Sequence, residues 1–471
     1  MEKNLSHISE DIKNFRSICA KKHITAQDLY VGYQIIKNYF GKHGRPREFV
    51  DVFLDLCDRF PSFLEHCSLP NGIVFAEDAF LLGYTISEDK SLYQKQIFEV
   101  IAEPYEIFIE KNCRKASINF QHEGASNDEI VILCRHGLTE GLYAPGKAIY
   151  SYAVALAESG QKTSIVVLGD LQEDFKNLGR NCENIRVMQL KDRDGASQLK
   201  VLTDIFNVLK PKALVTEMEF GMPSVISIVN KKLNSFFMSQ GFFDLPWYSK
   251  VFVPSDTVIN GSKRQQKDFV RYSSFILPEL LAKDRTDQQV FETKCALGIQ
   301  PNDFVIGSFG RMEKFTEEFL KDLSSVLTHN SNTKVLLAGP NDRGNVERLL
   351  KKHIGLGRAI VLGESDAHLL GKCCSISLDT YPSPAGHAAL EFQAKGVPVV
   401  YKNTKEVENF KSQRIEALRY NSRAELNNLV RKLSTDRRQL SQFRELSIEQ
   451  VNTTQRQNSN KFAKIIEANF D

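Results

Sequence analysis

From residue 128 onward, short apolar runs alternate with amphipathic helical stretches, and this pattern constrains the fold more than any other feature. Helices are expected near 146–159, 198–209 and 223–233. The apolar runs between them are EIVILC (129–134), SIVVLG (164–169), IRVMQL (185–190), ALVTE (213–217), SFFMS (235–239) and VFVPS (251–255). Strands that helices cover on both faces have this near-continuous apolar character. The pattern therefore predicts a parallel, doubly wound α/β sheet.

The alternation restarts after residues 257–303, which are polar and poorly patterned and which we interpret as a linker. A helix is expected at 317–328, and the new apolar runs are FVIGSF (304–309), KVLLAG (334–339), AIVLG (359–363), SISLDT (375–380) and VPVVYK (397–402). Open α/β sheets bind ligands outside the carboxyl ends of their strands. Two such sheets in tandem predict a ligand-binding cleft between them.

Helical patterns dominate both ends of the chain. In residues 1–120, apolar residues recur at helical spacing, for example at Leu29, Tyr30, Tyr33, Ile36 and Tyr39. Further helices are expected after Pro46 and at 75–86 and 90–112, and the stretch from 425 on is helical and polar. We therefore divide the chain into an α-helical domain (1–125), two Rossmann-like domains (126–258 and 259–440) and a C-terminal helix that packs back on the cleft (441–471).

Composition excludes several classes of protein. The chain has 471 residues, of which 42% are hydrophobic, and this length exceeds what one core accommodates. No apolar run approaches the ~20 residues that span a bilayer, and the start lacks the apolar segment of a secretory signal. We therefore expect a cytoplasmic protein without a transmembrane segment. Nine irregularly spaced cysteines are typical of reduced thiols, and a net charge of +3 gives no basic footprint for nucleic acid.

A loop at 381–391 predicts a phosphate site. Pro382 and Pro384 force a turn after the SISLDT strand, and Ala385, Gly386, His387 and Ala388 then expose backbone N–H groups at a helix N-terminus. Glu391 follows one turn later, where its carboxylate can accept hydrogen bonds from a ribose diol. The alternative interpretation is an ordinary capped turn between strand and helix.

A second strand-to-helix junction favours the phosphate interpretation. The stretch GSFGRMEKFTEEF (307–319) brings Arg311 and Lys314 to the same edge of the sheet. A lysine there neutralises a departing nucleotide diphosphate without a metal. We therefore expect Arg311 and Lys314 to bind the diphosphate of a nucleotide donor.

These motifs resemble those of the GT-B glycosyltransferases, and most of all the family of the O-linked N-acetylglucosamine transferases and the bacterial cytoplasmic protein N-glycosyltransferases. Lys314-Phe315-Thr316 resembles the family's Lys-hydrophobic-Asp/Asn stretch, whose lysine binds the diphosphate. His368, ahead of Leu378-Asp379-Thr380, resembles a family histidine near the nucleobase. The family's G-H/N-T-T-x-D loop matches Gly386 through Glu391. The resemblance implies a GT-B fold and a donor site made of these residues.

The sequence departs from that family at two points. Ala388 and Ala389 replace the two threonines, and Glu391 replaces the aspartate. A rival is the retaining GT-B family with a Glu-x7-Glu motif, in which Glu391 would be the second glutamate. The first would fall on Ser383, so the comparison favours the inverting family.

Inverting displacement needs a base near the acceptor. His136, just after the first strand, resembles a family histidine once proposed for this role, with Glu140, Glu217 and Glu219 as competing carboxylates. Asp192-Arg193-Asp194 has the Asp-x-Asp form of metal-dependent transferases, but it lies in the wrong domain for the donor. Lys147 follows a glycine and lacks the rest of a phosphate-binding loop. No metal is expected.

The resemblance implies an inverting, metal-independent glycosyltransferase that moves a sugar from a nucleotide sugar, a UDP-hexose or UDP-HexNAc, to a protein or glycan acceptor. The nucleotide sugar is a co-substrate, and no cofactor is expected. The N-terminal helical domain is the expected site of acceptor or partner binding. The alternatives are a retaining capsule or lipopolysaccharide transferase and a non-catalytic, transferase-like partner subunit. The residues define neither the particular sugar nor the oligomeric state.

Overall fold

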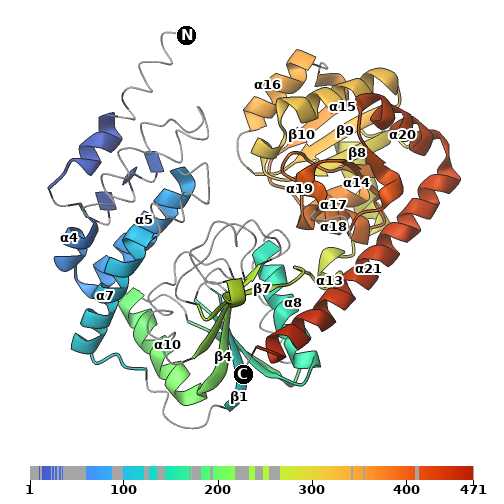
Figure 1. The fold of residues 1–471 in the computed structure, drawn as a ribbon. Coiled ribbons are helices and arrows are strands. Elements are labelled where there is room, and N and C mark those ends of the chain that lie inside the picture. Colours follow the sequence, from blue (N-terminus) through green and yellow to red (C-terminus); the bar gives the residue numbers. More distant parts are fainter. Residues whose placement is uncertain are drawn as a thin grey trace. The chain divides into compact units, whose positions relative to one another are not determined.

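A computed structural model gives the fold (Figure 1). It describes residues 10, 13–22, 24–25, 27–28, 31–32, 34–35, 60–86, 99–120, 127–134, 144–168, 171, 182–190, 195–217, 233–238, 248–253, 266–340, 343–353, 356–408 and 413–469. The chain forms two compact units: residues 1–139, 149–274 and 460–471 make the first, and residues 140–148 and 275–459 make the second.

The first unit is built on a parallel seven-stranded sheet with the order β3-β2-β1-β4-β5-β6-β7. Its strands are β1 (Asn127–Cys134), β2 (Lys162–Val167), β3 (Ile185–Gln189), β4 (Pro211–Glu217), β5 (Asn234–Met238), β6 (Lys250–Val253) and β7 (Phe269–Arg271). The chain winds outward from β1 in one direction and then from β4 in the other. This reversal is the hallmark of a doubly wound sheet, as the sequence predicted.

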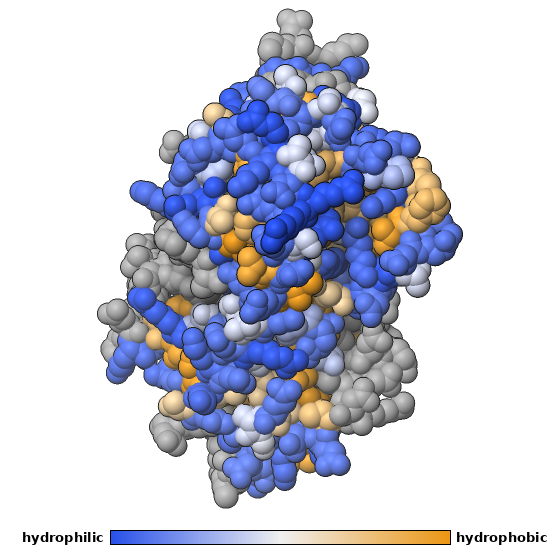
Figure 2. All heavy atoms as spheres, turned by 90° about the vertical axis from the view of Figure 1, so that its right-hand side faces the viewer, coloured by the Kyte–Doolittle hydropathy of each residue, from blue (hydrophilic) through white to orange (hydrophobic). Residues whose placement is uncertain are grey.

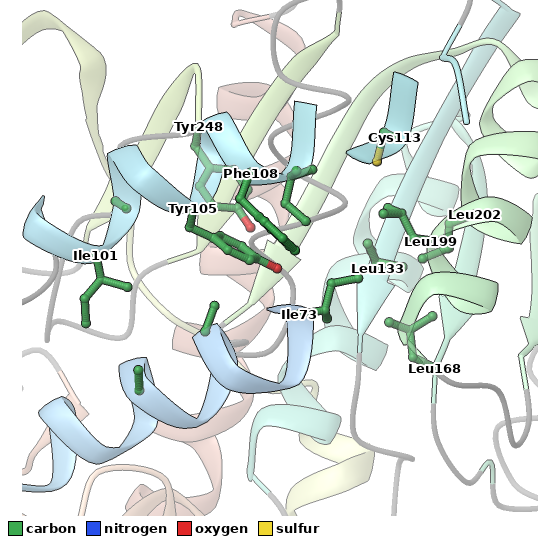
Figure 3. Packing of buried hydrophobic residues seen from close by; sticks show 14 of the residues in the cluster. Ile73, Ile101, Tyr105, Phe108, Cys113, Leu133, Leu168, Leu199, Leu202 and Tyr248 are labelled. Carbon is green, nitrogen blue, oxygen red and sulfur yellow. The ribbon is translucent and has the colours of Figure 1, made fainter. Parts of the chain in front are cut away.

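The helices of the first unit share a core with this sheet. They are α4 (Phe60–Glu65), α5 (Leu69–Ile86), α7 (Glu99–Lys115), α10 (Gly195–Leu209) and most of α8 (Ala144–Glu158), whose residues up to 148 group with the second unit. Figure 3 shows Ile73 of α5 and Tyr105 and Phe108 of α7 in the same hydrophobic cluster as Leu133 and Leu199. The N-terminal helices therefore bury their apolar faces together with those of the sheet and α10.

The second unit contains a parallel six-stranded sheet with the order β10-β9-β8-β11-β12-β13. Its strands are β8 (Phe304–Phe309), β9 (Thr333–Ala338), β10 (Ala359–Leu362), β11 (Ile376–Leu378), β12 (Val399–Lys402) and β13 (Arg419–Tyr420). The winding again reverses between two neighbouring strands, here β8 and β11, which pair directly. In doubly wound sheets ligands bind at this switch point.

Helices cover both faces of the second sheet. The helices of this unit are α13 (Pro278–Leu281), α14 (Asp287–Ala296), α15 (Glu317–His329), α16 (Arg343–His353), α17 (Ala367–Lys372), α18 (His387–Ala394), α19 (Lys405–Glu408), α20 (Arg423–Thr435) and most of α21 (Arg437–Glu467), with 3-10 turns at η3 (Met312–Lys314), η4 (Leu356–Arg358) and η6 (Glu416–Leu418). A further 3-10 turn, η2 (Gln266–Asp268), precedes β7 in the first unit. Side chains of a strand alternate between faces. Accordingly, Ile306 of β8 packs in one cluster with α15 and α20, whereas Val305 packs in another with α17 and α18.

The C-terminal helix α21 contributes to both units. Val451 packs with Ile276, Leu281 and Leu390 in the second unit. The residues from 460 on belong to the first unit, where the ring of Phe462 stacks on Tyr152 at a centroid distance of 4.8 Å. The helix α21 occupies the stretch for which a C-terminal helix was expected, and its packing on a cleft stays a prediction.

The interpretation of residues 257–303 as a linker was wrong. Within it, β7 pairs with β6 and extends the first sheet, and α14 forms a helix of ten residues. The pattern missed α14 because none of its residues is buried, so it has no apolar face. Its start carries a capping box, in which Thr286 and Gln289 bond each other's backbone N–H groups. The sequence T-x-x-Q is the signal that identifies this helix.

Hydrophilic residues cover most of the face that Figure 2 shows, with hydrophobic residues in small groups between them. Within the described ranges, no helix is long and apolar enough to cross a membrane. The cysteines of these ranges are free thiols, and Cys373 and Cys374 are buried in the second unit.

Candidate functional site

Asp379 fixes the loop that follows β11, residues 379–386. Its Oδ1 accepts a hydrogen bond from the backbone N–H of Ala385 at 2.7 Å, which closes the loop. Its Oδ2 accepts one from Nη2 of Arg414 at 2.8 Å, and these two side chains are 1% and 0% exposed. An unpaired charge buried to this extent would be strongly destabilising, so the two residues depend on each other. The pair holds both ends of the loop in place.

Two threonines hold the backbone of the same loop. The hydroxyl of Thr380 donates to the carbonyl oxygen of Ser383 at 2.6 Å, and that of Thr316 donates to the carbonyl oxygen of Tyr381 at 3.4 Å. Thr316 is also the N-cap of α15, where its hydroxyl accepts from the N–H of Phe319. The junctions after β8 and β11 are therefore bonded to each other at the switch point of the sheet.

Lys314 reaches the loop from the β8 side. Its Nζ donates to the carbonyl oxygen of Pro384 at 2.8 Å. Burial, and secondly the charge of Arg311, hold the pKa of Lys314 below its usual value. An ammonium group has three donors, and one bond to Pro384 uses one of them. The arrangement aims a half-buried lysine at the loop with hydrogen-bonding capacity left for an anion.

The helix α18 begins at this loop. Its N-cap is Gly386, which has φ of 56° and offers no side-chain cap. This backbone conformation favours glycine because a β-carbon is strained there. The N-terminus of a helix carries a partial positive charge. At α18 the N–H of Ala388, one of the groups predicted for a phosphate, donates to the carbonyl oxygen of Ala385 at 3.2 Å. Together with Lys314, the helix N-terminus makes the end of the loop electropositive.

Glu391 is paired within the protein. Its carboxylate forms an ion pair with Nζ of Lys147, and the side chains of the two residues are 12% and 9% exposed. Lys395, the C-cap of α18, donates to the carbonyl oxygens of Glu391 at 2.8 Å and Leu281 at 3.1 Å. Burial lowers the pKa of Lys395 to about 8. A ribose would have to compete with Lys147 for the Glu391 carboxylate.

The two candidate histidines are neutral at pH 7. Burial lowers the pKa of His368 to about 4, and burial does the same for His387. His368 is 1% exposed, and its Nδ1 accepts from the N–H of Lys283 at 3.4 Å. A neutral imidazole that accepts at Nδ1 carries its proton at Nε2. That buried Nε2 has no hydrogen-bond partner among the described residues.

All of the predicted donor-site residues lie in the second unit. Lys314 and the 386–388 backbone meet at the loop, and the charges of Lys314 and Glu391 both act on His387. The side chain of Arg311 is 64% exposed and lies 3.4 Å from the carboxylate of Glu313, and its charge acts on Lys314. His368 lies near enough to Lys395 and Glu391 for their charges to affect its pKa.

Most of the predicted acceptor-side residues lie outside the part of the chain that the structure describes. His136, Glu140 and Glu219 lie outside the described residues, as does the side chain of Glu217. Asp192 and Asp194, whose Asp-x-Asp form lies in the wrong domain for the donor, also lie outside them. In sequence, His136 follows β1 and Glu219 follows β4, the two strands at the switch point of the first sheet. Among the residues described, no group of three or more His, Cys, Asp or Glu is arranged to hold a metal ion.

Sequence reasoning missed the residues that shape the loop. Asp379 was noted only as part of a strand end, and Arg414 was not considered. They are 35 positions apart, and no local pattern links them. One signal was available, since a charged residue directly after a buried apolar strand usually has a partner.

No protein-family model and no curated protein matches the sequence. Solved structures match the fold. HepE of Anabaena, in complex with UDP and glucose, aligns with a TM-score of 0.51 at 14% identity over 72% of this chain and 99% of that one. An O-GlcNAc transferase mutant of Thermobaculum terrenum aligns with a TM-score of 0.53 at 13% identity over 98% and 96%. A glycosyltransferase from Rickettsia africae aligns with a TM-score of 0.53 at 16% identity over 72% and 100%.

The chain therefore has the fold of the GT-B glycosyltransferases, with two parallel sheets of seven and six strands that helices flank. This confirms the fold class predicted from the sequence.

Proposed function

We propose that the protein is an inverting, metal-independent glycosyltransferase. Its donor is a UDP-sugar, either a UDP-hexose or a UDP-HexNAc, and its acceptor is a protein or a glycan. The GT-B fold and the similarity to HepE, whose structure holds UDP and glucose, support a nucleotide-sugar donor. The similarity to the O-GlcNAc transferase over nearly the whole of both chains supports the inverting family that the sequence motifs resemble, over the retaining alternative.

One observation carries the proposal: Lys314 donates to the carbonyl oxygen of Pro384 within the loop at the N-terminus of α18. Lys314 and the loop come from β8 and β11, the strands between which the winding reverses. A cation and backbone N–H groups at a switch point are suited to a diphosphate.

In the proposed reaction, a nucleophilic oxygen or nitrogen of the acceptor forms a bond to the anomeric carbon. The bond between that carbon and the diphosphate oxygen breaks, and its electron pair leaves with UDP. Lys314 and the N-terminus of α18 stabilise the charge on the leaving diphosphate. The acceptor proton passes to a base, for which His136 is the candidate and Glu140, Glu217 and Glu219 are the competitors.

The test is donor turnover by the purified protein with a panel of UDP-sugars and with peptide and glycan acceptors. The proposal predicts UDP release with at least one donor, no loss of rate with EDTA, and a product of inverted anomeric configuration by proton NMR. Lys314→Met should abolish release, whereas Lys321→Met, at an exposed lysine of α15, should not. Retention of configuration would favour the capsule or lipopolysaccharide alternative. UDP binding without turnover of any donor would favour the non-catalytic subunit.

A further inference from the structure

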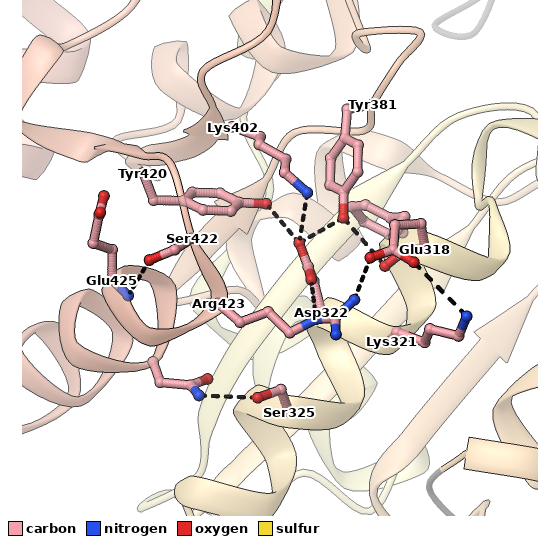
Figure 4. Close-up of polar contacts among 12 residues, drawn as sticks. Glu318, Lys321, Asp322, Ser325, Tyr381, Lys402, Tyr420, Ser422, Arg423 and Glu425 are labelled. Carbon is pink, nitrogen blue, oxygen red and sulfur yellow. Dashed lines mark hydrogen bonds and ion pairs between the residues drawn. The ribbon is translucent and has the colours of Figure 1, made fainter.

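The carboxylate of Asp322 is the centre of a buried polar network in the second unit (Figure 4). Asp322 lies on α15 and is 1% exposed. Its Oδ1 accepts from Nε of Arg423 at 2.6 Å. Its Oδ2 accepts from the hydroxyl of Tyr381 at 2.5 Å, from that of Tyr420 at 3.4 Å and from Nζ of Lys402 at 3.4 Å. One side chain thus joins α15, the loop after β11, β12, β13 and α20.

Tyr381 is the member of this network that belongs to the candidate phosphate loop. Its ring packs edge-on against Phe319 at a centroid distance of 5.8 Å, and Nζ of Lys402 lies 4.0 Å from the ring centre. Its hydroxyl also lies 3.1 Å from the carbonyl oxygen of Glu318. The side chain is therefore fixed at both its ring and its tip, and three residues later Pro384 accepts the hydrogen bond of Lys314.

The network keeps the tyrosine hydroxyl a donor. Burial and the neighbouring Asp322 carboxylate raise the pKa of Tyr381 well above its usual value. The hydroxyl therefore donates to Asp322 throughout the physiological range. Side chains locked by neighbouring packing and hydrogen bonds hold a binding site in its productive geometry.

We propose that Asp322 is a positioning residue for the donor diphosphate, which acts through Tyr381. Asp379 fixes the loop at its first residue and at Ala385, and Asp322 fixes the segment between through the side chain of Tyr381. The loop and Lys314 are then preset before a nucleotide binds. The inference rests on the proposed function, since it assumes that the loop binds a nucleoside diphosphate.

Two tyrosines on the same carboxylate provide a matched test. Tyr381→Phe and Tyr420→Phe each remove one hydroxyl that bonds Oδ2 of Asp322, but only Tyr381 belongs to the loop. Calorimetric titrations with UDP and UMP, and melting temperatures, are measured for the wild type and both variants. Asp322→Asn is a third variant, and its nucleotide affinities are interpreted only if its circular dichroism spectrum matches that of the wild type.

The expected result for Tyr381→Phe is UDP binding weakened by about fivefold, the equivalent of one lost hydrogen bond, with a reduced preference for UDP over UMP. Tyr420→Phe should keep the wild-type preference whatever its melting temperature. Equal changes in that preference for both variants, or no change in either, would overturn the inference and leave the proposed function standing. A wild-type protein that binds neither nucleotide would overturn both.

Discussion

The candidate phosphate loop (379–386) and the charge cluster around α18 (Lys147, Glu391 and Lys395) lie in one unit, and they satisfy their polar groups in different ways. The loop is held by buried groups behind it, Asp379 with Arg414 and Tyr381 with Asp322. The cluster bonds to itself, since Glu391 pairs with Lys147.

This difference separates a preset site from a site that must exchange partners. In the proposed function, a diphosphate at the loop meets Lys314, which has donors to spare, and binding should cost little because the loop is already ordered. A ribose at Glu391 has to replace an existing ion pair. The loop should therefore supply most of the affinity for a nucleoside diphosphate, and the charge cluster should change that affinity only slightly.

The largest effect is expected from breaking the support of the loop. Asp379→Asn leaves the guanidinium of Arg414, which is 0% exposed, without its charge partner. Removing one member of a buried pair typically costs about 3–5 kcal/mol in the free energy of unfolding. Chemical denaturation of the wild type and the variant measures the difference.

The control for that experiment is an exposed pair. Glu347→Gln breaks the ion pair with Arg343 on α16, whose side chains are 39% and 53% exposed. This change should cost less than about 1 kcal/mol. If Asp379→Asn cost no more than Glu347→Gln, the loop would not depend on its buried pair.

The next effect in size concerns the ligand rather than the fold. Lys314→Met keeps most of the side-chain volume but removes the ammonium group that bonds Pro384. We expect UDP to bind about 10–100-fold more weakly, as for the loss of a charged hydrogen-bonding partner. Calorimetry against Lys321→Met, at a lysine exposed on α15, provides the comparison. Similar affinities for the two variants would remove Lys314 from the site.

The strands of the second unit and the residues that support the loop differ in how well the sequence predicts them. The strands β8 and β9 are continuous apolar runs, and the sequence located them to within a residue or so. The strands β7 and β13 were missed because three and two residues are too few to form a pattern. At the site, local motifs identified Lys314 and the turn at Gly386. The side-chain contacts that support the loop could not be predicted from local motifs, because Asp322 and Tyr381 are 59 positions apart and meet only in the folded chain.

His368, whose pKa responds to burial and to the charge of Lys395, should make the stability of the fold depend on pH in the acid range. The pKa of His368 is lowered from 6.5 to about 4, so the folded protein holds its neutral form. The stability that this neutral form contributes is complete above pH 6.5 and is lost as the pH falls toward 4. We expect a loss on the order of 1–3 kcal/mol from this residue across that interval.

Denaturation at several pH values compares the wild type with His368→Asn, in which the pH dependence should be smaller. His329→Asn, at an exposed histidine of α15, should leave it unchanged. Parallel curves for the wild type and His368→Asn would show that burial does not control this histidine.

The smallest effect is expected from freeing Glu391. Lys147→Met removes its ion-pair partner, so the carboxylate becomes available to a ribose diol. We expect about threefold tighter binding of UDP, the equivalent of a partly buried ion pair that no longer has to be displaced. The affinity for 2′-deoxy-UDP should change less. Weaker binding of both nucleotides would mean that Lys147 itself contacts the ligand.

The most direct test of the account is a crystal structure of the wild-type protein with UDP. The account predicts the diphosphate at the N-terminus of α18, with Nζ of Lys314 within hydrogen-bond distance of a phosphate oxygen and the loop 379–386 unchanged. UDP bound away from this loop, or a loop rebuilt around the nucleotide, would contradict the claim that the protein presents a preset diphosphate site.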